Sequence, residues 1–151
     1  PLCIWPPHCL IGSLGHSIKT EVSDALIQWS DENFGRVDFV TKGSNMFTEH
    51  YSAVRADVED DQDPTTALNT DLIEILADAD EIPISGQALS HCVAFTVTDI
   101  ADNFGAENIK KFTLLEDTCS NVTGFEQNGI NFVANMRNRG MKVAKSTDYF
   151  V

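Results

Sequence analysis

Apolar residues in this chain recur mainly at spacings of three and four, the pattern of helices that bury one face. The clearest example begins near Ile18, where Val22, Ala25, Leu26 and Trp29 follow on the same helical face. The same spacing predicts further helices at about 69–79, 91–104 and 125–139. Short apolar runs predict strands at 36–41, 81–87, 112–115 and 141–145.

Residues with strong positional preferences mark the ends of these elements. Asn69 or Thr70 can cap the helix at 69–79, and Gly105 and Gly140 stand where the next two helices should stop. Pro83 weakens the strand prediction at 81–87, because proline cannot donate a hydrogen bond to a sheet. Helices and strands alternate along the chain, which predicts an α/β domain with a parallel sheet and helices on its faces.

Two stretches predict loops. Residues 1–16 are rich in proline, glycine and histidine, and residues 43–68 include an acidic run at 57–63. A loop as long as the second is usually functional or mobile in a compact domain. The acidic run lacks the spaced ligands and the glycine of a calcium loop, so we interpret it as solvated.

Composition adds bounds on size and partners. The 151 residues, 42% of them hydrophobic, suffice for one compact domain over residues 1–151 and not for two. The net charge of −13 disfavours nucleic acids and anionic membranes as partners. No apolar run is long enough to cross a bilayer, and the first residues do not resemble a signal peptide.

The cysteines are widely separated and show no zinc-type pairing. They are Cys3, Cys9, Cys92 and Cys119. Their separation favours a reducing, cytoplasmic setting, although a disulfide pair remains open.

Cys92 stands where the strand at 81–87 is predicted to turn into the helix at 91–104. Open α/β sheets bind ligands at this carboxyl edge. A helix N-terminus stabilises anions and so favours a reactive thiolate, and its unpaired N–H groups can hold an oxyanion. A buried cysteine that packs as a small apolar side chain is the alternative.

Four segments, in the right order, resemble signature segments of nicotinamidases and isochorismatase-like cysteine hydrolases. Segment 86–93 (GQALSHCV) is similar to their nucleophile segment, and 39–43 (FVTKG) to the strand end that carries a catalytic lysine. Segment 51–53 (YSA) is similar to the Tyr-Ser-Ala/Gly element after that lysine. Segment 5–9 (WPPHC) resembles the Trp-Pro-x-His-Cys loop of nicotinamidases, so the resemblance covers nearly the whole chain.

The resemblance implies a covalent mechanism in which a thiolate attacks an amide carbonyl, ammonia leaves and water resolves the thioester. It implies that Cys92 is the nucleophile and that Lys42 is the cation beside the thiolate. The backbone N–H groups of Ala88 and Cys92 would form the oxyanion hole, and the Gln87–Ala88 peptide bond would be cis. His91 adjoins Cys92, but neighbours at a helix start point in different directions, so we predict no Cys–His dyad.

The same resemblance implies an aromatic substrate and a divalent metal ion, with zinc as the first expectation. His8 would be one metal ligand, while the family's other ligands, an Asp and two His, lie upstream of the matching loop. Trp5 and Tyr51 would line the substrate pocket. Ordinary packing is the alternative for Trp5 and Tyr51, and a solvated or structural role is the alternative for His8.

The family fold is a three-layer αβα sandwich with a mostly parallel, Rossmann-like sheet of strand order 3-2-1-4-5-6. This sequence matches strands 3 to 6, and no position matches strands 1 and 2 or the family's general-base aspartate. Strands 1 and 2 would lie in the middle of the sheet, where unpaired backbone groups are unfavourable. We therefore expect a segment of about 50 residues, carrying the aspartate and the other metal ligands, to precede Pro1 or to come from another polypeptide.

The resulting hypothesis is an amidohydrolase that acts on nicotinamide or a similar small aromatic amide. An isochorismatase-like or carbamoyl-amide hydrolase remains open, because Leu89 and Ser90 differ from the polar pair common in nicotinamidases. A catalytically incomplete binding or structural fragment also remains open. Relatives are often dimers or tetramers, so a homo-oligomer is expected by analogy.

Overall fold

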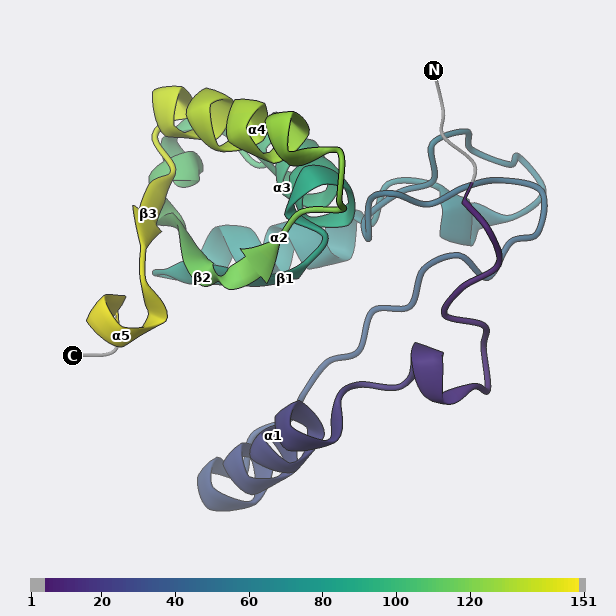
Figure 1. The fold of residues 1–151 in the computed structure, drawn as a ribbon, viewed down its shortest axis with the longest axis horizontal. Coiled ribbons are helices and arrows are strands. Elements are labelled where there is room, and N and C mark those ends of the chain that lie inside the picture. The colour runs from purple at the N-terminus through teal and green to yellow at the C-terminus, as the bar shows by residue number, and fades with distance from the viewer. Residues whose placement is uncertain (1–4, 150–151) are drawn as a thin grey trace. The chain divides into compact units, whose positions relative to one another are not determined.

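The structure is a computed structural model that describes residues 5–149. The chain divides into two compact units, Pro1–Phe39 and Val40–Val151 (Figure 1). Cys3 lies outside the described residues, and the expected single domain over residues 1–151 stays a prediction. Within residues 5–149, no helix combines the length and the apolarity that a membrane crossing requires.

The first unit holds the helix α1 (Thr20–Asn33), which follows one 3₁₀ turn at Leu14–His16. α1 starts two residues after the predicted start at Ile18. It ends where Phe34 adopts left-handed backbone, with φ at 50°, and donates its N–H to the carbonyl of Ser30. The predicted helix is confirmed, but none of its residues is buried.

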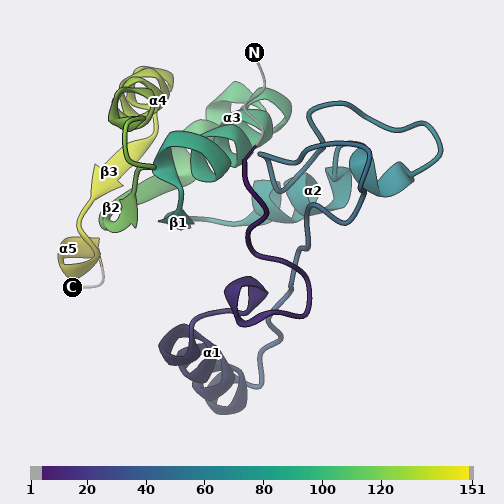
Figure 2. The ribbon, with the colours of Figure 1, turned by 45° about the vertical axis from the view of Figure 1, so that its right-hand side comes forward.

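A parallel sheet in the order β1-β2-β3 forms the centre of the second unit (Figures 1 and 2). The strands are β1 (Ile82–Gln87), β2 (Phe112–Ser120) and β3 (Lys142–Ala144). Leu114 pairs with Ile84 on one side and with Val143 on the other. A bulge after Ile84 then brings Gly86 opposite Cys119. Because the strands are parallel, their carboxyl ends lie along one edge of the sheet.

Helices connect the parallel strands, as the alternating pattern predicted. α3 (Ala94–Asn103) joins β1 to β2, and α4 (Glu126–Arg139) joins β2 to β3. α2 (Thr70–Asp78) precedes β1, and the short α5 (Ser146–Tyr149) follows β3 and contacts β2. α3 and α4 lie on one face of the sheet and α5 on the other (Figures 1 and 2). The predicted α/β fold with a parallel sheet is therefore confirmed.

The predicted helix ends also agree with the structure. The side chain of Asn69 caps α2 by accepting the N–H of Leu72 at 3.0 Å. Gly140 ends α4 in left-handed backbone, with φ at 114°, a conformation that glycine adopts without a steric penalty.

Side chains of β2 and α4 supply the centre of the core. Leu114 and Met136 are fully buried, and Phe112 is 1% exposed. The ring of Phe112 stacks on that of Phe104, at the end of α3, with centroids 5.0 Å apart. These contacts hold α3 and α4 against β2, the central strand of the sheet.

We expect Met136→Ala to lower the free energy of unfolding by about 2–5 kcal/mol, because it removes a fully buried side chain and leaves a cavity. Urea unfolding followed by circular dichroism measures the loss. Ile130→Ala is the matched control, since Ile130 lies on the same helix and is 58% exposed. Equal losses in the two variants would contradict the placement of Met136 in the core.

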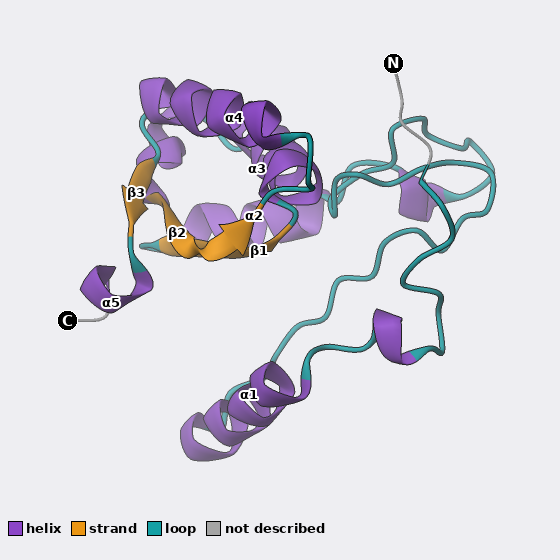
Figure 3. Cartoon of the chain, in the orientation of Figure 1, coloured by secondary structure: helices purple, strands orange, loops and turns teal. Residues whose placement is uncertain are grey.

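The predicted strand at 36–41 is wrong: this segment is a loop (Figure 3). A strand needs a neighbour for its backbone hydrogen bonds, and no described segment pairs with residues 36–41. β2 is longer than predicted, because it continues past Leu115 to Ser120 along the pairing with β1. The first three residues of the predicted helix at 91–104 belong instead to a π-helical turn at Leu89–Val93, and the α-helix begins at Ala94.

Candidate active site

Cys92 lies in the π-helical turn Leu89–Val93, between the carboxyl end of β1 and the start of α3. The carbonyl of Ala88 accepts two N–H groups of this turn, those of His91 at 3.0 Å and Val93 at 3.1 Å. The thiol is free and partly exposed. The turn therefore presents a sulfur atom at the edge of the sheet where α/β proteins bind ligands.

Lys42 approaches Cys92 from a loop 50 residues earlier in the chain. Its Nζ donates to Cys92 Sγ at 3.1 Å and to the carbonyls of His50 and Tyr51, both at 2.9 Å. These three acceptors use the three N–H donors of an ammonium group. A cation held this close favours the thiolate form of a cysteine.

Side chains fix the loop that supplies the two carbonyls. The N–H of Tyr51 donates to Asp57 Oδ2 at 3.0 Å, and the N–H of Ala53 donates to Thr96 Oγ1 of α3 at 2.9 Å. The Thr96 contact links the loop to the same helix that follows Cys92. α3 therefore anchors both sides of the Lys42–Cys92 contact, because it follows Cys92 directly and binds the loop that holds Lys42.

The acidic run at 57–63 is an ordered loop. Asn45 donates through Nδ2 to Asp60 and to Asp63, both at 3.0 Å, and Thr66 Oγ1 accepts the N–H of Asp60 at 2.8 Å. Thr65 and Asn45 hydrogen bonds lower the pKa of Asp63, so its carboxylate stays charged. The run is therefore organised by its own polar contacts, and it is the loop that leads from Lys42 towards α2.

Aromatic rings pack beside Cys92. The ring of His91 meets those of Tyr51 and Phe125 edge to face, with centroids 5.7 and 4.9 Å apart. Tyr51 also meets Phe95 at 5.0 Å. Tyr51 is only 7% exposed, so ordinary packing accounts for much of its surface, although its carbonyl binds Lys42.

The fold lowers the pKa of both His91 and His50, which favours their neutral forms. Burial lowers the pKa of His91. Burial and the positive charge of Lys42 lower the pKa of His50, although Asp57 and other carboxylates oppose this. Both ring nitrogens of His50 are buried without a partner among the described residues, so a proton there would be poorly accommodated.

These pKa directions predict that stability falls as the pH drops below about 6.5, the pKa of an unfolded histidine. The unfolded chain binds protons in this range more readily than the folded one, so acid favours unfolding. Urea unfolding at a series of pH values between about 7.5 and about 5.5 measures the effect. In His50→Gln the dependence should weaken, and an unchanged dependence would refute the role of His50.

The remaining site residues suggested by the resemblance fall into two groups. The Gln87–Ala88 peptide bond is cis, and Ala88 is the residue before the turn that holds Cys92. Trp5 and His8, in contrast, belong to the first unit. The structure therefore brings Lys42, Tyr51, Ala88 and Cys92 together within the second unit.

The described residues do not fit a metal site. His8 is exposed, and its Nδ1 donates to the carbonyl of Pro6 at 2.8 Å. No group of three or more His, Cys, Asp or Glu side chains within residues 5–149 could hold a metal ion. The expected zinc ion would need ligands outside these residues and stays a prediction.

Sequence reasoning missed several residues that contact the loop and the turn of the candidate site. Thr96, Phe95 and Phe125 carried no signal, because each acts through a contact distant in sequence. Ser90 could have been noticed, since it precedes Cys92 in a turn where hydroxyl groups often bind backbone N–H groups. The prediction of no Cys–His dyad is consistent with His91, whose Nδ1 lies 2.9 Å from Ser90 Oγ.

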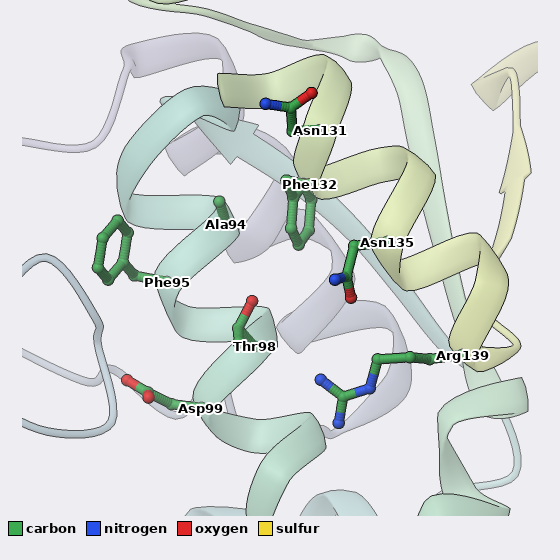
Figure 4. Close-up of a pocket in the computed structure, with 8 residues that line it drawn as sticks. All are labelled: Ala94, Phe95, Thr98, Asp99, Asn131, Phe132, Asn135 and Arg139. Carbon is green, nitrogen blue, oxygen red and sulfur yellow. The ribbon is translucent and has the colours of Figure 1, made fainter. Parts of the chain in front are cut away.

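A separate groove of about 490 Å³ lies between α3 and α4 (Figure 4). Thr98 of α3 and Asn135 and Arg139 of α4 reach into it, and neither Cys92 nor Lys42 lines it. Arg139 is paired with Asp102 at 2.8 Å. The groove shares Phe95 with the aromatic cluster beside Cys92, but the two proposed reacting groups lie outside it.

Comparison with solved structures finds this fold in nicotinamidases. A yeast nicotinamidase, Pnc1p, matches with a TM-score of 0.63 and 22% identity, over 94% of this chain and 58% of its own. PnC1 from L. infantum, solved in complex with nicotinate, gives 0.66 and 24%, over 95% and 62%. The Acinetobacter baumanii nicotinamidase/pyrazinamidase gives 0.64 and 20%, over 96% and 60%.

No family model and no curated protein matches the chain. The structural likeness shows that the chain has the α/β fold of these enzymes. The chain spans about three fifths of their length.

Proposed function

We propose that this protein is a cysteine amidohydrolase of small aromatic amides, with nicotinamide as the first candidate and Cys92 as the nucleophile. The proposal depends on one observation above all, the 3.1 Å contact between Lys42 Nζ and Cys92 Sγ at the carboxyl edge of a parallel sheet. The fold shared with nicotinamidases supports the substrate class. Since the chain spans about three fifths of the length of these enzymes, the activity is proposed for the protein as a whole.

In the proposed reaction, the Cys92 thiolate attacks the amide carbonyl carbon and forms a carbon–sulfur bond. The carbon–nitrogen bond then breaks, and the nitrogen leaves as ammonia after it takes up a proton. Water hydrolyses the thioester, which releases the carboxylic acid and restores the thiol. The net change is one amide and one water converted to one acid and one ammonia.

The residues around Cys92 have separate tasks in this scheme. Lys42 stabilises the attacking thiolate, and its contacts with two backbone carbonyls hold it in place. The backbone N–H groups of Ala88 and Cys92 would bind the oxygen that becomes negative in the tetrahedral intermediate. Tyr51 positions Lys42 through its carbonyl.

Ammonia release from a set of amides tests the substrate class. We expect the full-length protein to release ammonia from nicotinamide faster than from aliphatic carbamoyl compounds of similar size. A preference for the carbamoyl compounds would favour the alternative hydrolase. No release from any amide, by protein with a reactive Cys92, would refute the proposed function.

The contact with Lys42 also predicts that Cys92 is the most reactive thiol. Exposure alone would predict Cys9, which is exposed, ahead of the partly exposed Cys92 and Cys119. Alkylation with limiting iodoacetamide, followed by peptide mass spectrometry, should nevertheless label Cys92 first. Earlier labelling of Cys9 or Cys119 in the folded protein would be evidence against an activated thiol.

A further inference from the structure

Ser90 has a position in the candidate site that the proposed mechanism leaves unused. It lies two residues before Cys92 in the π-helical turn, and it is 2% exposed. Its Oγ accepts the N–H of Val122 at 3.0 Å and lies 2.9 Å from Nδ1 of His91. A buried hydroxyl with two polar contacts fixes the parts of the chain that it joins.

The first contact ties the Cys92 turn to the sheet. Val122 follows β2 by two residues, so its N–H lies just beyond the carboxyl end of the central strand. Ser90 and Val122 are 32 residues apart in sequence. Their hydrogen bond therefore attaches the turn to the end of β2, in addition to its covalent attachment to β1.

The second contact leads towards Lys42. Ser90 Oγ orients the ring of His91, which packs edge to face against Tyr51 at 5.7 Å. The carbonyl of Tyr51 accepts from Lys42 Nζ at 2.9 Å. A continuous set of contacts thus runs from Ser90 through His91 and Tyr51 to Lys42, while the backbone runs from Ser90 to Cys92.

We propose that Ser90 is a positioning residue that sets the distance between Lys42 Nζ and Cys92 Sγ, by anchoring the turn on Val122 and orienting His91. This inference rests on the proposed role of Cys92 as the nucleophile. The interaction of a cation with a thiolate weakens as the two atoms separate and as water enters between them. Loss of the Ser90 hydroxyl should therefore make Cys92 less reactive without removing any group that touches the sulfur.

Ser90→Ala tests the inference directly. It removes the hydroxyl that the Val122 N–H and His91 Nδ1 contact, while the side chain of Cys92 is unchanged. We expect the rate of Cys92 alkylation by iodoacetamide at neutral pH to fall about tenfold. No amide substrate is needed, so this result is independent of whether nicotinamide is hydrolysed.

Thr66→Val is the matched control for the loss of a buried hydroxyl. Thr66 is fully buried in the same unit, and its Oγ1 accepts the N–H of Asp60 at 2.8 Å and donates to the carbonyl of Asp63 at 2.7 Å. Its substitution should lower the urea midpoint and leave the Cys92 alkylation rate unchanged. An equal loss of reactivity in Thr66→Val would show a general effect of destabilisation and overturn the inference.

His91→Phe provides a second route to the same answer. Phenylalanine keeps a ring between Tyr51 and Phe125 but has no nitrogen to meet Ser90. We expect it to slow alkylation of Cys92 in the same direction as Ser90→Ala. The inference would be overturned if Ser90→Ala and His91→Phe both folded and reacted at the native rate. It would also be overturned if neither variant folded, because that would show a purely structural role.

If the variants slowed alkylation but the native protein did not hydrolyse nicotinamide, only the proposed function would be overturned.

Discussion

Cys92→Ala is expected to abolish ammonia release from nicotinamide, with a fall in kcat/KM of at least about 10³-fold. The variant removes the sulfur that would form the thioester, and no other side chain can replace a carbon–sulfur bond. The β-carbon remains, so the packing of the turn between β1 and α3 is kept. Steady-state kinetics on the full-length protein, with circular dichroism to confirm folding, measures the effect.

Cys119→Ala is the matched control for this prediction. Cys119 is also a free, partly exposed cysteine, and it lies on β2 opposite Gly86 of β1. Its removal should leave nicotinamide hydrolysis within about twofold of the native rate, because the residue does not meet the proposed reacting atoms. Full activity in Cys92→Ala, or a loss in Cys119→Ala as large as in Cys92→Ala, would show that the nucleophile is assigned wrongly.

The longer helices and the three strands of the second unit could be predicted because their signals are local. Asn69 and Gly140 mark helix ends through hydrogen bonds and backbone angles that involve only nearby residues. The apolar run from Phe112 to Leu115 similarly identifies the central strand, since it is buried on both faces. Such signals depend on no distant partner, so they survive in the sequence alone.

The segment 36–41 could not be judged in this way. Its run of apolar and β-branched residues suits a strand, but strand formation depends on a neighbour that the segment itself does not encode. α5 was missed for the opposite reason, because four residues are too few to show a period. The π-helical turn at Leu89–Val93 has no spacing pattern that separates it from the start of an α-helix.

The candidate site shows the same division between local and distant signals. The strand-to-helix position of Cys92 follows from local pattern, and the structure places the residue there. The approach of Lys42 across 50 residues has no local signal and was expected only from the resemblance to a known family. Neither a local pattern nor the family resemblance predicted the contact of Ser90 with Val122, because the sequence does not show which N–H a buried hydroxyl accepts.

The charge of Lys42 gives the second large prediction. Lys42→Met keeps an unbranched apolar stem of similar length and removes the ammonium group, so packing changes little while the contact with Cys92 Sγ is lost. We expect turnover of nicotinamide to fall about 10²-fold or more, because the thiolate loses its stabilising charge before it attacks the amide. The rate of iodoacetamide labelling at Cys92 should fall in the same variant.

Lys111→Met separates this electrostatic effect from the loss of a lysine as such. Lys111 is also partly buried and also donates to a backbone carbonyl, that of Ala77 at 2.6 Å, but it is not among the groups that contact Cys92. The Lys111→Met variant should keep both the turnover of nicotinamide and the labelling of Cys92.

Lys42→Arg provides the last comparison. A guanidinium retains the positive charge, but it is planar and cannot direct donors to two carbonyls and a sulfur as an ammonium does. We expect it to recover part of the labelling rate and little of the turnover, because charge alone favours the thiolate whereas catalysis also needs the sulfur held in one place. Native labelling of Cys92 in Lys42→Met would contradict an activating role for Lys42, however the turnover changed.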